Sequence, residues 1–178
     1  YLYQINYMFF KKTEIKVNLP KLLDHYNHNY SSQSTRRISI NSRTESYDPA
    51  DLCAQLVYTE YPIILPEFKG TVWEETLNLI PGKKSRARIH TVSPFSVLEA
   101  HRDFEKRYHV ALVTDEACKI VDLENNMLYH IPADGYVYEI DTTVLHTFIN
   151  TSNNCFRTHL VVCQYAVSYT HPRAHETR

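Results

Sequence analysis

The sequence predicts a mainly β fold, in which a small antiparallel barrel of the jelly-roll kind carries helices packed outside it. Two observations support this fold class. Short segments rich in β-branched and aromatic residues follow one another from Arg86 onward, and turn residues such as Ser93-Pro94 separate them. The part before Arg86 carries helical signals instead. A chain of 178 residues suits one domain with a substantial core.

Residues 1–85 are expected to form a helical or irregular part that packs on the barrel within the same domain. Residues 19–30, LPKLLDHYNHNY, predict a short helix because Pro20 stands in the first turn. Residues 48–61 predict a second helix that starts at an Asp-Pro pair. Residues 71–82, TVWEETLNLIPG, predict a third helix or a bent strand that ends at a Pro-Gly pair.

Residues 86–166 are expected to form the barrel itself, which holds any catalytic site. The strand-like segments are separated by turn residues at regular intervals, a pattern typical of a sandwich or a small barrel. The expected strands are 86–92, 107–114, 118–123, 127–132, 135–141, 146–152 and 157–167.

Residues 167–178, VSYTHPRAHETR, form an abruptly polar and histidine-rich end after the last strand. The string resembles the conceptual translation of a sequencing adapter, and we expect a non-native tail. A natural disordered tail is the competing interpretation. Neither interpretation gives the histidines of this segment a functional role.

Composition excludes several function classes. The net charge is -1, without the basic excess that nucleic-acid binding proteins show. No apolar run approaches the roughly 20 residues that span a bilayer, and the apolar start has no cationic region before it, so no signal peptide is expected. The cysteines are dispersed without a CxxC pair, which predicts reduced thiols in a cytoplasmic protein. They are Cys53, Cys118, Cys155 and Cys163.

A possible metal site begins in the segment EAHRDFEKRYHVAL, residues 99–112. His101 and Asp103 stand two positions apart, so on a strand both side chains would face the same way. His146 begins a later strand, which a small barrel would bring close. Two histidines and one carboxylate on one side of a metal are typical of non-haem Fe(II) oxygenases. Each residue alone is equally compatible with an ordinary polar position.

Further charged and imidazole side chains could line the same pocket. Arg157 begins the last strand, and a buried arginine in a barrel requires an anionic partner such as the far carboxylate of a dicarboxylate. Arg107 and His109 share a strand face and are candidates for the same ligand, although an exposed strand charge and a core histidine are the alternatives. His90 and His159 fit supporting or structural roles near the site.

The segments EAHRDFEKRYHVALVT, HIPADGYVYEIDTTVLHTFINTS and FRTHLVV resemble the Fe(II)/2-oxoglutarate-dependent oxygenases, specifically the aspartyl/asparaginyl (and prolyl) β-hydroxylase family. The resemblance covers a little under half of the chain, from about Arg86 to Val162. It implies a double-stranded β-helix fold. Animal aspartyl/asparaginyl hydroxylases of this family lack the carboxylate ligand, so Asp103 makes the chain more similar to the prolyl-hydroxylase-like members.

The resemblance also implies a site and an activity. Iron would be held by His101, Asp103 and His146, and Arg157 would bind the C5 carboxylate of 2-oxoglutarate, with Arg107 and His109 as further cosubstrate contacts. The implied enzyme consumes dioxygen and 2-oxoglutarate, hydroxylates a peptidyl Pro, Asp or Asn or a free amino acid, and releases succinate and CO2.

Two other classes of protein fit the same residues. A cupin-type isomerase or hydrolase would bind Zn or Mn at the same three ligands and would not need Arg157. A non-enzymatic jelly-roll binding module would carry His101 and its neighbours as a surface turn and would hold no stoichiometric metal. A third possibility is that the chain is a fragment of an oxygenase and is inactive.

Overall fold

The computed structural model describes residues 8–32, 36–45 and 59–165. The helix expected over 48–61 lies almost entirely outside these residues, and so does the tail over 167–178. The rest of the chain is mainly β with antiparallel sheets, as expected. No helix in the described residues is long and apolar enough to cross a membrane.

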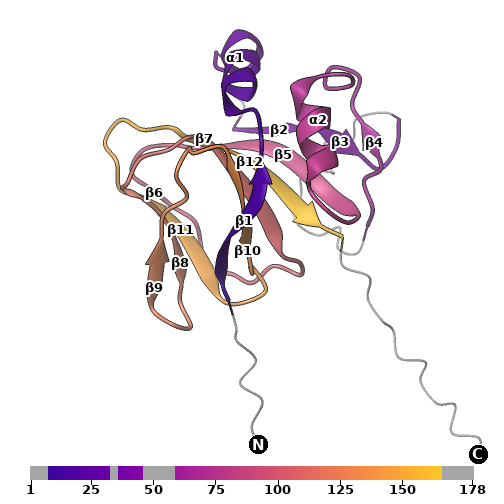
Figure 1. The fold of residues 1–178 in the computed structure, drawn as a ribbon. Coiled ribbons are helices and arrows are strands. Elements are labelled where there is room, and N and C mark those ends of the chain that lie inside the picture. Colours follow the sequence, from indigo (N-terminus) through magenta and orange to yellow (C-terminus); the bar gives the residue numbers. More distant parts are fainter. Residues whose placement is uncertain (1–7, 33–35, 46–58, 166–178) are drawn as a thin grey trace, which may run out of the picture.

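The large sheet has six strands in the order β1-β10-β7-β12-β5-β2, and every neighbouring pair is antiparallel. The inner strand β12, the last strand among the described residues, pairs with β7 on one side and β5 on the other (Figure 1). The strands are β1 (Phe10–Lys16), β10 (Tyr136–Ile140), β7 (Arg107–Val113), β12 (Arg157–Gln164), β5 (Lys84–Val92) and β2 (Arg37–Ser39).

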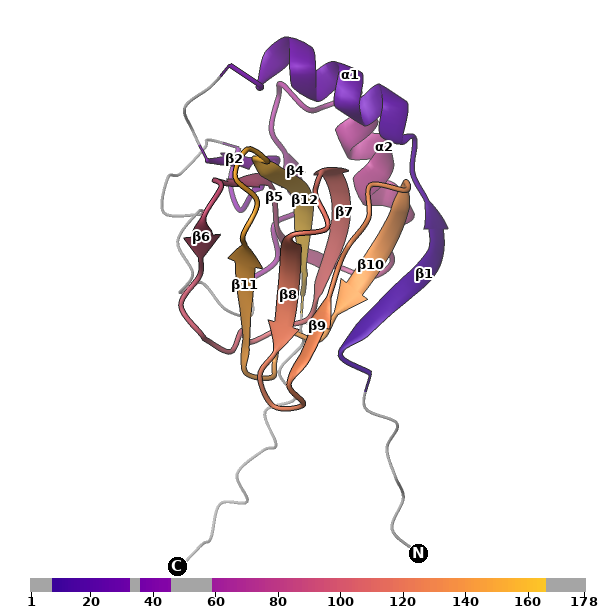
Figure 2. The same cartoon turned by 90° about the vertical axis from the view of Figure 1, so that its left-hand side faces the viewer.

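The small sheet has four strands in the order β6-β11-β8-β9. It lies across one face of the large sheet (Figure 2), and an apolar cluster that includes Ala111 of β7 and Phe148 of β11 packs between the two. The strands are β6 (Ser96–Val97), β11 (His146–Asn150), β8 (Cys118–Asp122) and β9 (Met127–Tyr129). A separate short pair joins β3 (Asn41–Ser42) to β4 (Ile63–Ile64).

All the strands expected after Arg86 are present, with ends that differ by a few residues. The N-terminal part differs more, because it supplies strands as well as helices. β1 forms one edge of the large sheet and β2 forms the other, so the chain before residue 85 is integrated into the sheet. β1 reads FKKTEIK, in which lysines occupy an edge strand and obscure the alternation of a buried one.

Both helices begin at a capping side chain. The Asn18 side chain accepts a hydrogen bond from the Lys21 backbone N–H (3.1 Å) at the start of α1 (Leu19–Asn29). Thr71 caps α2 (Val72–Leu79) in the same way by accepting from the Trp73 N–H (3.3 Å). The segment for which a helix or a bent strand was expected is therefore a helix, and Pro81 follows its end.

The two faces of the large sheet have opposite chemistry. One face is apolar and packs against α1 and α2, with Ala87, Ile89, Val110, Leu160 and Val162 in the same core as Trp73. The other face, which looks toward the small sheet, carries arginine and histidine side chains at alternate positions of β5, β7 and β12. This separation leaves a polar pocket beside the apolar cluster between the sheets.

Candidate metal centre and its pocket

His101, Asp103 and His146 come together in the structure. One ligand atom from each side chain lies within 4.8 Å of those of the other two. His146 is the first residue of β11, and His101 stands between β6 and β7. The sequence therefore identified, from widely separated segments, a cluster with the donor set of a metal site.

The expectation that His101 and Asp103 share a face of a strand is wrong. His101 forms only an isolated bridge with His146, in which each backbone N–H donates to the other's carbonyl at 3.0 Å. Asp103 is outside any strand, and its backbone N–H donates to the Thr142 carbonyl (2.8 Å). These backbone bonds, rather than the pleat of a strand, aim both side chains at His146.

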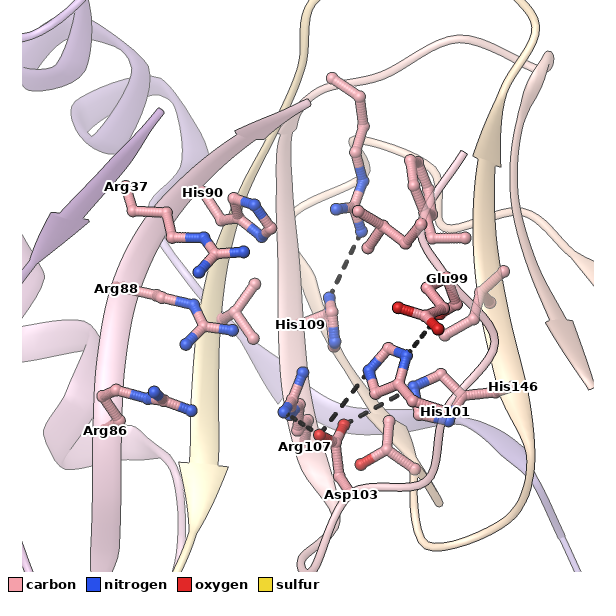
Figure 3. A pocket seen from close by; sticks show the side chains of 16 residues that line it. Arg37, Arg86, Arg88, His90, Glu99, His101, Asp103, Arg107, His109 and His146 are labelled. Atoms are coloured by element: carbon pink, nitrogen blue, oxygen red, sulfur yellow. Dashed lines mark hydrogen bonds and ion pairs between the residues drawn. The ribbon is translucent and has the colours of Figure 1, made fainter. Parts of the chain in front are cut away.

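Both histidines present the same ring nitrogen to the cluster. The Nδ1 atom of His101 donates to the Glu99 carbonyl (2.7 Å), and Nδ1 of His146 donates to the Val144 carbonyl (2.9 Å). A carbonyl oxygen can only accept, so Nδ1 carries the proton and Nε2 keeps its lone pair. The Nε2 atoms lie 3.8 Å and 3.6 Å from the Asp103 carboxylate (Figure 3). This is the tautomer that a metal requires.

The Asp103 carboxylate has one occupied and one available oxygen. The Arg107 guanidinium pairs with Oδ1, and both side chains are mostly buried. Oδ2 is buried and has no hydrogen-bond partner among the described residues. A buried carboxylate oxygen is costly unless something satisfies it. Burial also lowers the pKa of His146, which keeps its imidazole neutral near pH 7. The three side chains thus fit a bound cation.

Arg157 is a buried cation without a carboxylate partner in the described part of the chain. Its side chain is 3% exposed, and its guanidinium carbon stands 4.1 Å from the centre of the Phe148 ring. Nη2 donates to Nδ1 of His159 (2.6 Å), and Nδ1 of His109 lies 3.5 Å away. Burial lowers the pKa of Arg157 to about 9. At neutral pH the pocket therefore holds an uncompensated positive charge.

His109 and His159 support this arginine as neutral acceptors. Both are buried, and desolvation together with the charge of Arg157 lowers their pKa well below 6.5. The structure gives His159 the shorter contact with Arg157, whereas the sequence favoured His109 as the pocket residue. The sequence RTH could have indicated that His159 lies beside Arg157, because residues 157 and 159 share a strand face.

The pocket around the cluster has a volume of about 270 Å³. Its wall includes all six residues expected at the site: His101, Asp103, Arg107, His109, His146 and Arg157. It also includes Arg37, Arg86, Arg88 and His90, whose arginines the sequence analysis did not select. The pattern RARIH at residues 86–90 could have indicated them, since alternate residues of a strand share a face and those of β5 point into the pocket.

Comparison with known proteins adds no family. No protein-family model matches the chain, and a search of curated proteins finds no match. The case for a function therefore depends on the geometry of the pocket.

Proposed function

We propose that the chain is an Fe(II)- and 2-oxoglutarate-dependent dioxygenase that hydroxylates an amino-acid residue of a peptide or a free amino acid. One observation carries the proposal. A cluster of two histidine Nε2 atoms and a carboxylate shares a pocket with a buried arginine that has no acidic partner among the described residues. A metal ion would bind the two histidines and the carboxylate, and a dicarboxylate would provide the anion that the arginine lacks.

The order of the strands supports a double-stranded β-helix for the core. From β5 to β12 the chain passes back and forth between the sheets, with β5, β7, β10 and β12 in the large sheet and β6, β8, β9 and β11 in the small one. Eight antiparallel strands in two facing sheets are typical of a jelly roll. The candidate ligands lie after β6 and at the start of β11, where the small sheet borders the pocket.

In this proposal His101, Asp103 and His146 hold the iron, and Arg157 holds the far carboxylate of 2-oxoglutarate. Bound iron and 2-oxoglutarate would supply the oxidation itself, in which dioxygen is consumed, 2-oxoglutarate becomes succinate and CO2, and a substrate C–H bond is hydroxylated. The protein contributes orientation and charge. Arg107 fixes the Asp103 carboxylate, and the two backbone carbonyls fix the histidine rings.

The charge of Arg157 favours this function over the two alternatives. A metal-dependent isomerase or hydrolase with the same ligands would leave a desolvated guanidinium without a counter-ion. A binding module without metal would leave Oδ2 of Asp103 buried and unsatisfied. A dicarboxylate that reaches from the metal to Arg157 gives both groups a partner.

The test is an anaerobic titration of metal-free protein with Fe(II) and then 2-oxoglutarate. We expect the visible charge-transfer band of the iron chelate, and we expect His146→Ala to lose it. The matched control is His28→Ala, which removes an exposed histidine of α1 and should keep the band. A folded wild-type protein that binds Fe(II) but gives no band with 2-oxoglutarate would overturn the proposal.

A further inference from the structure

One wall of the pocket consists of three arginines that face the candidate metal ligands. We call Arg37, Arg86 and Arg88 the arginine wall. Figure 3 shows them on one side of the pocket, with His101, Asp103 and His146 on the other. Arg86 and Arg88 occupy alternate positions of β5, and Arg37 of β2 pairs with His90 two positions further on. Strand geometry therefore holds the three guanidiniums on one surface.

The pocket has more positive than negative side chains. Five arginines and two carboxylates, those of Glu99 and Asp103, line it. Arg107 already pairs with Asp103, and Glu105, buried next to the pocket, interacts with Arg107 and Arg86. Glu99 is exposed. A divalent cation at the three ligands would increase the positive excess. Because 2-oxoglutarate carries only two negative charges, it leaves a positive excess among the described side chains that line this pocket.

Arg88 is the member of the wall with the clearest need for an anion. Its side chain is 5% exposed, its Nε has no hydrogen-bond partner, and no ion pair is found for it among the described residues. Burial, together with the charges of the nearby Arg107, Arg86 and Arg37, lowers the pKa of Arg88 to about 9. A guanidinium held in this way binds a carboxylate strongly, because its two parallel N–H groups match the two oxygens.

We propose that the arginine wall is a second anion subsite, which binds a carboxylate of the substrate that is hydroxylated. The inference rests on the proposed function, because that function assigns one carboxylate of 2-oxoglutarate to the metal and the other to Arg157. The wall is then left for the other substrate. The substrate class is a carboxylate-bearing amino acid, either as a free molecule with its α-carboxylate or as an acidic residue within a peptide.

The surroundings of the wall leave room for either form. A second depression of about 460 Å³ shares Arg37, His90 and Leu98 with the pocket and continues past Val97 between β5 and β6. A peptide chain could therefore leave the pocket at Arg37, while a free amino acid would fit within the first cavity. Arg37, at one end of the wall, lines both cavities, whereas Arg86 and Arg88 line the first cavity alone.

The experiment compares acids with their amides by calorimetry, using metal-free protein and protein loaded anaerobically with Fe(II) and saturating 2-oxoglutarate. One pair is L-proline and L-prolinamide, which tests a free α-carboxylate. The other is N-acetyl-aspartic acid amide and N-acetyl-asparagine amide, which tests an acidic side chain in a peptide-like setting. We expect the acid of one pair to bind at least about tenfold more tightly than its amide, the effect of a hydrogen bond to a charged group.

The variants assign the preference to the wall. Arg88→Met should abolish the preference for the acid while the iron chelate band remains, and Lys21→Met, which removes an exposed charge on α1, should keep both. If Arg88→Met does not fold, Arg88→Lys retains the charge without the bidentate fork and should show an intermediate preference.

Three results would overturn the subsite: neither acid binds, acid and amide bind equally, or the preference survives in Arg88→Met. Loss of the chelate band in Arg88→Met would also overturn it, by assigning Arg88 to 2-oxoglutarate. Absence of the band in the wild type would contradict the proposed function and not the subsite. In that case the calorimetric titration of metal-free protein would still measure the preference for the carboxylate.

Discussion

The Arg107 guanidinium pairs with one oxygen of the Asp103 carboxylate and leaves the other oxygen, Oδ2, buried without a hydrogen bond among the described residues. An ion pair on one oxygen fixes the orientation of the whole group. The free oxygen then points toward the Nε2 atom of His146, 3.6 Å away. This relationship makes Arg107 a positioning residue for the candidate ligand, in addition to any contact it makes with a cosubstrate.

Replacement of Arg107 should weaken metal binding. We expect Arg107→Met to lower the affinity for Fe(II) or Mn(II) by about 10–100-fold, because loss of a group that orients a ligand typically has this effect. Arg107→Lys should recover part of the loss. Competition titration with a chelating dye measures the affinity, and Lys106→Met, which breaks a partly buried ion pair with Glu139, is the control. Equal affinity in the Met variant and the wild type would contradict the positioning role.

Replacement of Arg157 should weaken the binding of 2-oxoglutarate much more than it slows turnover at saturation. Arg157→Ala should raise the KM for 2-oxoglutarate by about 10–100-fold with a smaller effect on kcat at saturation, because the lost contact is to a carboxylate far from the reacting atoms. Steady-state kinetics measures the split. An unchanged KM would remove Arg157 from the cosubstrate site.

The same position makes a prediction about stability. The Arg157 guanidinium is desolvated and paired with neutral histidines, so Arg157→Met should leave the urea midpoint unchanged or raise it. A fall of about 3–5 kcal/mol in unfolding free energy, the loss expected when one partner of a buried ion pair is removed, would contradict this view of the site.

Mild acid should destabilise the protein through the buried histidines. Burial, with the charges of Arg88 and Arg157, lowers the pKa of His90 to about 2, against 6.5 in the unfolded chain. Below pH 6.5 the unfolded chain takes a proton that the folded protein refuses, so stability is highest above pH 6.5 and falls as the pH decreases. The loss is roughly 1.4 kcal/mol per such histidine between pH 7.5 and pH 5.5.

Urea unfolding at these two pH values measures the effect, and pH 5.5 avoids most carboxylate titration. His90→Gln should reduce the pH dependence, whereas His28→Gln on the exposed face of α1 should not. A wild-type protein equally stable at both pH values would show that these histidines are not held neutral.

The Asn41 side chain should be important for the stability of the region next to the arginine wall. Its amide donates to the carbonyls of Tyr61 (2.9 Å) and Ser85 (2.8 Å), and its oxygen accepts from the Ala87 N–H (2.7 Å). The residue is 1% exposed. Asn41→Ala should lower the unfolding free energy by roughly 3 kcal/mol, about 1 kcal/mol for each bond. Chemical denaturation checks the value, and the exposed Asn27→Ala should change it by less than about 0.5 kcal/mol.

The sequence was most informative where local pattern and local structure coincide. The strands after Arg86 could be predicted because β-branched runs are bounded by turn residues, and the three candidate ligands could be predicted from residue type and order. β1 could not, because FKKTEIK is an edge strand whose lysines face solvent. Arg86 and Arg88 were not selected, although they alternate in RARIH, because arginine is normally exposed. Only the pairing of β5 with β12 and β2 shows that these side chains line a cavity.

Because the two faces of the large sheet differ, the residues of the pocket and those of the apolar core occupy alternate positions along the strands. Along β5 the even-numbered positions 86, 88 and 90 reach the pocket, and the odd-numbered positions 87 and 89 enter the core beneath the helices. Substitutions at the even positions therefore change the lining of the pocket, whereas substitutions at the odd positions change the apolar core. Insertion of one residue within this strand would turn the arginines that follow it into the core and isoleucine into the cavity. A change in strand length would therefore disrupt both the core and the pocket, whereas a substitution at one position would alter only one of them.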